Sequence, residues 1–131
     1  MERLKGKVAI ITGATAGIGK AIAKLFAEEG AIVVVVGRNS QAAEERVREI
    51  ESTGHQALAI RCDISSISDI QNMVNKTLER FEKIDILVNN AAVDHSGRAT
   101  EISGEDWDTL MNINQKGTFR CCQAVGNPIL E

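Results

Sequence analysis

Three glycines directly after an apolar stretch could bind a phosphate group through the main chain. The run from Val8 to Thr12 has the composition of a buried strand, and Gly13, Gly17 and Gly19 follow it where a helical pattern begins. Gly13 permits a tight turn, Gly17 lets a ligand phosphate approach the backbone, and Gly19 lets the new helix pack close to the strand. The unpaired N–H groups and dipole of a first helical turn favour an anion, although an ordinary flexible loop would need the same glycines. The candidate binding residues at this turn are Gly13, Thr15, Ala16, Gly17, Ile18 and Gly19.

Arg38 lies where a dinucleotide-binding fold reads the ribose of its ligand. It follows Gly37 and the apolar run of residues 31–36, about 20 residues beyond the glycine turn. A guanidinium can hold a phosphate through two hydrogen bonds, whereas an acidic residue here would bind a 2′-hydroxyl and repel a 2′-phosphate. We therefore expect NADP(H) rather than NAD(H) as the ligand. The alternative is a solvated loop arginine.

Polar residues follow two further strand-like segments. Asp63 and Ile64 come directly after residues 56–62, and the carboxylate would point into the crevice where open α/β sheets bind ligands. Alternatively, Asp63 begins a loop and caps the next turn. Asn89, Asn90 and Ala91 end the segment 84–89. Their two amides could bond neighbouring backbone and hold the strand end open, and the small alanine would let a ligand pass close by.

Asn114 interrupts an apolar stripe on the last expected helix, seven residues after Trp107. We expect its amide to be buried, and an unsatisfied buried amide costs about 1–3 kcal/mol, so it must have partners. The alternative is a structural asparagine in the core whose amide forms hydrogen bonds only with the backbone. Gly117 would let this helix press close to its neighbour.

Charge and composition exclude several classes of protein. A net charge of −3 without a basic run argues against general affinity for nucleic acid or anionic membranes. The longest apolar run, residues 31–36, is too short to cross a bilayer. The first seven residues lack a secretory signal, and three cysteines without disulfide or zinc spacing favour the cytoplasm and no metal site. His55 and His95 are expected in turns as solvated residues.

Apolar periodicity predicts four strands that alternate with four helices. The expected strands are residues 8–12, 31–36, 56–62 and 84–89. The expected helix faces are Ile18, Ile22, Leu25 and Phe26; Ala43, Val47 and Ile50; Ile67, Ile70, Val74, Leu78 and Phe81; and the stripe from Trp107 to Val125, after which Gly126-Asn127-Pro128 should disturb the helix. Short connections between them predict an α/β fold with a Rossmann-like doubly wound parallel sheet. We expect one domain over residues 1–131, truncated after the fourth strand and the helix that follows.

Helix boundaries are marked by capping residues. Asn39 or Ser40, Ser66 and Ser103 are expected at helix N-termini, the last two in capping boxes. Gly30 and Gly54 are expected just beyond helix C-termini.

Four motifs in order resemble the short-chain dehydrogenase/reductase family. They are T-G-x-x-x-G-I-G, C-D-I at Asp63, N-N-A-A at Asn89 and the segment from Trp107 to Gly117 around Asn114. The resemblance implies hydride transfer between a nicotinamide cofactor and a carbonyl or alcohol. It also implies that Asp63 contacts the adenine ring and that Asn114 orders a water in a proton relay. Alanine replaces the family's glycine at position 92.

The family's Ser and Tyr-x-x-x-Lys have no counterpart here, and the chain contains no tyrosine. Family members are about twice as long. We therefore expect the nucleotide-binding half of such an enzyme, inactive by itself. The alternative is a non-catalytic nucleotide-binding or interaction module that pairs with a full-length relative. An apolar edge at residues 84–89 and an uncovered face on the Trp107 helix predict self-association or a covering partner.

Overall fold

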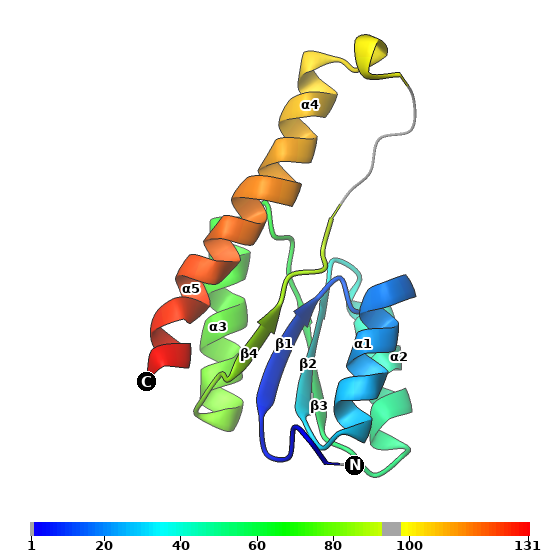
Figure 1. Cartoon of the computed structure of the whole chain (residues 1–131), viewed down its shortest axis with the longest axis vertical. Coiled ribbons are helices and arrows are strands. Elements are labelled where there is room, and N and C mark those ends of the chain that lie inside the picture. The colour runs from blue at the N-terminus through cyan, green and yellow to red at the C-terminus, as the bar shows by residue number, and fades with distance from the viewer. Residues whose placement is uncertain (1, 93–97) are drawn as a thin grey trace.

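The fold is built on four parallel strands. The computed structural model describes residues 2–92 and 98–131. The strands are β1 (Val8–Thr12), β2 (Ile32–Gly37), β3 (Ala57–Arg61) and β4 (Ile86–Val88), in the order β3-β2-β1-β4 (Figure 1). β1 is buried along its whole length because helices cover both faces of the sheet, as parallel sheets require. The predicted parallel, doubly wound sheet is therefore confirmed.

Two helical layers enclose this sheet. α1 (Gly17–Glu28) and α2 (Ser40–Glu51) lie on one face, and α3 (Ile67–Phe81) and α5 (Thr118–Leu130) lie on the other (Figure 1). Alternate residues of β1 enter different cores: Ile11 packs with the α1 and α2 side, whereas Ile10 packs with the α3 and α5 side. None of the described helices is long and apolar enough to cross a membrane.

Side-chain caps fix the starts of three helices. Asn39 accepts a hydrogen bond from the Ala42 N–H at the start of α2 (3.1 Å), and Ser66 accepts one from the Asp69 N–H at the start of α3 (3.2 Å). Ser103 caps α4 (Gly104–Met111) in the same way. All three predicted caps are confirmed, with Asn39 rather than Ser40 capping α2. The capping box predicted at Ser66 is wrong, because the Ser66 N–H donates to the Asp63 carbonyl and not to the Asp69 carboxylate.

The predicted apolar face of α1 is partly wrong. Ile18 and Leu25 are 74% and 51% exposed, while Gly19, Ala23 and Ala27 are buried against the sheet. The helix packs so close to the sheet that small residues occupy the contact line, and larger apolar side chains stand beside it. Ile67 is likewise exposed, because it begins α3 and lies outside the buried stripe.

The C-terminal helical segment is longer than the sequence pattern indicated. After a short 3₁₀ turn η1 (Ala99–Glu101), α4, the π-helical η2 (Asn112–Gly117) and α5 follow without interruption. Pro128 lies inside α5, so the expected disturbance at Gly126-Asn127-Pro128 is absent. Pro128 removes one N–H donor in the last turn, and the helix continues to Leu130 despite this loss.

β4 is shorter than the predicted 84–89. It pairs with β1 only from Ile86 to Val88. Before this point the Asp85 carboxylate accepts the Val8 N–H at 2.9 Å, so a side chain replaces a main-chain acceptor in the ladder.

Candidate functional site

A cavity of about 240 Å³ opens where the strands end. Most of its wall comes from the residues that follow β1, β2, β3 and β4, at the carboxyl edge of the sheet. It brings together the predicted site residues Gly13, Thr15, Arg38, Asp63, Ile64, Asn90 and Ala91. Four segments far apart in the sequence therefore share one wall, as their positions after parallel strands predict.

Two glycines of the β1–α1 turn are required by close contacts. Gly13 has φ +64°, and a Cβ there would lie 2.9 Å from the Ala91 Cα. A Cβ on Gly19 would overlap the Gly13 carbonyl oxygen and the Asn90 side-chain amide. The predicted tight turn at Gly13 and close packing at Gly19 are confirmed.

Gly17 differs from these two, because it begins α1 with φ +56° and its missing Cβ faces open space. Ala16 before it is extended, and no described side chain caps this helix. Ala16, Gly17, Ile18 and Gly19 form the start of α1 and do not line the cavity. The first turn of α1 therefore has no side-chain cap, and open space surrounds the Cβ position of Gly17.

Thr12 holds the ends of β1 and β4 together, a role that the sequence reasoning missed. Its hydroxyl accepts hydrogen bonds from the Asn90 and Ala91 N–H groups, each at 3.0 Å, and donates to the Val88 carbonyl at 3.4 Å. A hydroxyl residue at the end of an otherwise apolar strand was the available signal. The Asn90 side chain completes this junction by donating to the Gly13 carbonyl at 3.0 Å.

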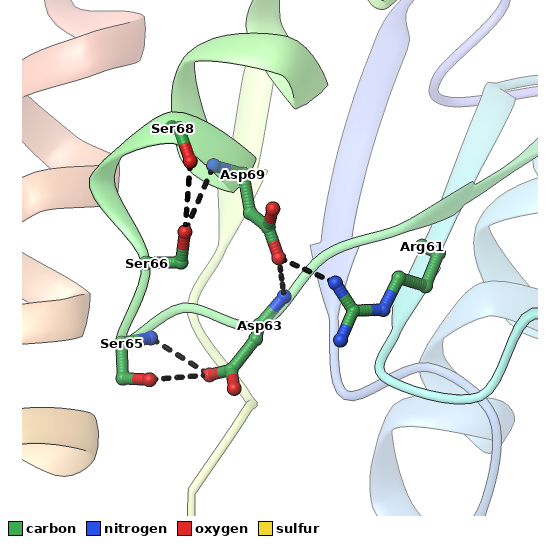
Figure 2. A network of polar contacts seen from close by, with 6 residues as sticks. All are labelled: Arg61, Asp63, Ser65, Ser66, Ser68 and Asp69. Carbon is green, nitrogen blue, oxygen red and sulfur yellow. Dashed lines mark hydrogen bonds and ion pairs between the residues drawn. The ribbon is translucent and has the colours of Figure 1, made fainter.

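Asp63 lines the cavity. It also fixes its own loop through the hydrogen bonds drawn in Figure 2. Its Oδ1 accepts hydrogen bonds from the Ser65 hydroxyl (2.7 Å) and the Ser65 N–H (2.9 Å). These bonds, with the charges of Arg38 and Arg61, hold the pKa of the Asp63 carboxyl below its ordinary value. The loop-capping interpretation is therefore confirmed, and Asp63 also lines the cavity.

Arg38 borders the cavity with an exposed side chain. It forms no hydrogen bond or ion pair with another residue of the described ranges, although its charge acts on Asp63. Gly37 allows Thr15 to approach, since a Cβ there would lie 2.7 Å from the Thr15 methyl group.

Asn89 and Asn114 lie outside the cavity wall. The Asn89 amide donates to the Cys122 thiol at 3.4 Å rather than to neighbouring backbone. The expectation that Asn114 is buried is wrong, because this residue is exposed within the π-helical turn η2. Gly117 does press close to its neighbour as predicted: a Cβ there would lie 2.8 Å from the Ile64 carbonyl oxygen.

The cysteines and histidines add no reactive group to the described part of the site. Burial raises the pKa of the Cys62 thiol to about 12 and that of Cys121 to about 11, so both stay protonated and unreactive. His55 lies between α2 and β3, as expected, whereas His95 falls outside the described residues. The described residues contain no group of three side chains able to hold a metal ion.

Comparisons with known proteins agree with this architecture. Residues 7–131 match the family described as short chain dehydrogenase. The chain is 40% identical over 128 residues to a (2S)-[(R)-hydroxy(phenyl)methyl]succinyl-CoA dehydrogenase subunit of Thauera aromatica, covering 98% of this chain and 52% of that protein. It is 40% identical over 129 residues to a D-threitol dehydrogenase of Mycolicibacterium smegmatis, with coverage of 98% and 50%.

A solved structure resembles the fold closely. The hydroxysteroid dehydrogenase from Escherichia coli superposes with a TM-score of 0.90 at 42% identity, covering 97% of this chain and 51% of that one. The chain spans about half the length of the curated relatives it matches. Family match, sequence identity and superposition agree: this chain belongs to the short-chain dehydrogenase/reductase family of oxidoreductases.

Proposed function

We propose that this chain binds NADP(H) and forms the cofactor-binding part of an oxidoreductase that transfers hydride between the nicotinamide and a carbonyl or alcohol. The observation that carries the proposal is the cavity at the carboxyl edge of the sheet, beside the glycine turn. Open α/β sheets bind ligands at this edge, where the strand order reverses. Here the reversal lies between β1 and β4.

The residues at the cavity fit such a cofactor. The main chain from Thr15 to Gly19 would hold the pyrophosphate, because Gly17 leaves open space where a side chain would stand. The Asp63 carboxylate would meet the adenine with Ile64, and Asn90 and Ala91 would lie beside the nicotinamide ribose. A volume of about 240 Å³ is below the roughly 300–1,000 Å³ of typical ligand pockets, so we propose that the cavity encloses only part of the dinucleotide.

The preference for NADP(H) over NAD(H) rests on Arg38. Its guanidinium has no ion-pair partner among the residues that the structure describes, so it is available for a 2′-phosphate. An acidic residue that would bind a free 2′-hydroxyl is absent between Val36 and Arg38.

A bound nicotinamide would supply or accept the hydride, and the chain's own residues would orient it. A proton donor is a separate requirement, and the sequence contains no tyrosine to fill that role. General acid–base help is worth about 10²–10⁴ in rate, so we propose that this polypeptide alone reduces carbonyls poorly, if at all. Asn89 would support the strand end through Cys122, and Asn114 would order a water near the site, a role that rests on the family resemblance.

A second candidate is a module that lends its surface to another chain. It is favoured by Trp107 and Phe119, which are 53% and 62% exposed, and by β4, which pairs only with β1 in the described sheet. Such an apolar edge is a template for further pairing. We propose self-association or a covering partner at the β4 edge and at Trp107 and Phe119. We also propose that residues 1–131 act as one domain. Its location would be the cytoplasm, because all three cysteines are free.

Titration with NADPH, followed by nucleotide fluorescence, tests the proposal. A saturable change at micromolar to millimolar NADPH is expected, with weaker binding of NADH. Unchanged fluorescence at millimolar NADPH would remove both nucleotide-binding interpretations and leave only the interaction module. Carbonyl-dependent oxidation of NADPH by this polypeptide alone would contradict the proposed inactivity.

A further inference from the structure

Asp69 joins the start of α3 to the end of β3 and to Asp63, which lines the cavity. This residue lies in the first turn of α3, yet its Oδ2 accepts hydrogen bonds from the Asp63 N–H at 3.0 Å and from Arg61 Nη1 at 2.7 Å. Figure 2 shows one oxygen of the Asp69 carboxylate joined by dashed lines to both the Asp63 main-chain nitrogen and the Arg61 guanidinium. The start of α3 is capped independently by Ser66, so the Asp69 side chain is not needed to begin the helix.

The Asp63 carboxylate has one oxygen available for a ligand. Its Oδ1 is held by Ser65, whereas Oδ2 has no hydrogen-bond partner in the described part of the chain. A carboxylate that stays ionised is an acceptor only, and the lowered pKa of Asp63 keeps it so near neutral pH. Its free oxygen therefore selects a ligand that offers an N–H donor over one that offers a carbonyl.

Asp69 protects this arrangement in two ways. It holds the Asp63 main chain through the N–H, which fixes where the carboxylate begins. It also holds the Arg61 guanidinium, whose charge already acts on Asp63 and which would otherwise be free to pair with the Asp63 Oδ2. The Arg61 side chain is half exposed, and Asp69 is its one ion-pair partner among the described residues.

We propose that Asp69 is a positioning residue for base recognition, which acts through Asp63 and Arg61 to make the site prefer a base with an exocyclic amino group. The inference rests on the proposed function, because it requires a dinucleotide in the cavity. Asp69 itself need not touch the ligand.

The test compares dissociation constants for NADPH and for its deamino analogue, in which hypoxanthine replaces adenine. A missing hydrogen bond to a charged group costs about 1.5–3 kcal/mol, so the wild-type chain should prefer NADPH by roughly tenfold or more. Asp69→Asn should reduce this preference to about twofold or less. Glu79→Gln, an exposed acidic residue later on α3, is the matched control and should keep the full preference.

The ratio of the two dissociation constants distinguishes a positioning role of Asp69 from a purely structural one. If Asp69→Asn weakens both nucleotides equally and leaves the ratio intact, Asp69 is merely structural and the inference is overturned. Asp69→Glu keeps the charge but displaces it from Asp63, so it should give an intermediate ratio and serves if the Asn variant does not fold. An unchanged ratio in Asp69→Glu overturns the inference as well.

Two wild-type results would also decide the matter. Equal affinity for the two bases would overturn the inference while leaving the proposed function standing. Failure to bind either nucleotide would overturn the proposed function itself, and the inference with it.

Discussion

At the scale of single residues, opposite charges border one cavity. Arg38 follows β2 and Asp63 follows β3, and the register between these strands, which pairs Gly37 with Arg61, brings both side chains to the same edge. The carboxylate is fixed by Ser65, whereas the guanidinium has no partner in the described ranges. The site is thus rigid where a base would bind and adaptable where a phosphate would bind.

Arg38→Asp tests the assigned role of the arginine. Loss of charge-assisted hydrogen bonds worth about 1.5–3 kcal/mol should weaken NADPH binding by roughly 10- to 100-fold and leave NADH binding nearly unchanged. Fluorescence titration of both nucleotides provides the measurement. Arg48→Asp, an exposed charge reversal on α2, should alter neither affinity. Equal loss of NADPH and NADH binding would refute the assignment of Arg38 to a 2′-phosphate.

Gly19→Ala tests whether close contact at the turn stabilises the fold. The added methyl group would meet the Gly13 carbonyl and the Asn90 amide, and forced overpacking costs about 1–3 kcal/mol. The midpoint of urea unfolding should fall accordingly. Gly126→Ala, inside α5 with open space around its Cβ position, should instead keep or raise stability. Similar losses in the two variants would contradict the contact argument.

At the scale of elements, capping residues set where helices begin relative to the cavity. Ser66 starts α3 directly after the loop that carries Asp63 and Ile64, so the cap also determines the position of Asp69. α1 lacks a side-chain cap at the corresponding point, and its main chain remains open beside the glycine turn. The capped helix α3 therefore supports the loop that carries Asp63, whereas the uncapped start of α1 is proposed to bind a ligand.

Ser66→Ala removes the hydrogen bond that caps α3. An N-cap serine contributes about 0.5–2 kcal/mol, so stability to urea should fall by about 1 kcal/mol, and amide protons in the first turn of α3 should exchange faster. Ser40→Ala, at the first position of α2 where Asn39 already caps the helix, should change stability by less than about 0.5 kcal/mol. If the two variants behave alike, Ser66 does not cap the helix in solution.

At the scale of the whole molecule, the edge strand β4 is covered less completely by helices than the edge strand β3. β4 forms the edge of the described sheet, and the helical segment from α4 to α5 carries exposed Trp107 and Phe119 (Figure 1). The opposite edge strand, β3, is covered by α2 and α3. Uncovered apolar surface of this kind favours association.

Sedimentation velocity should therefore reveal self-association that rises with protein concentration. The double variant Trp107→Glu and Phe119→Glu should shift the chain toward monomer, because two charges would be desolvated at the contact. Leu25→Glu, at a similarly exposed site on α1, should leave the distribution unchanged. Concentration-independent sedimentation of the wild-type chain as a monomer would exclude self-association.

The parallel sheet, the helix caps and the edge at which the cavity lies could be predicted from the sequence, because each depends on local pattern and on general rules for parallel sheets. The face of α1 could not, since periodicity shows which residues are apolar but not that Ala23 packs closer than Leu25. The exposure of Asn114 could not be predicted either, because this residue lies in a π-helical turn that the apolar periodicity did not predict. The contact of Asp69 with Asp63 needed the loop geometry, because six residues of sequence separation permit many arrangements.

The central claim is that main-chain amides between β1 and α1 form a cradle for the cofactor's pyrophosphate. Two-dimensional ¹H–¹⁵N NMR spectra of the chain, recorded during titration with NADPH, test it most directly. The account predicts the largest saturable shifts at the amides of Thr15, Ala16, Gly17, Ile18 and Gly19, with further shifts at Asp63 and Ile64. Shifts confined to other parts of the chain, or none at millimolar NADPH, would contradict it.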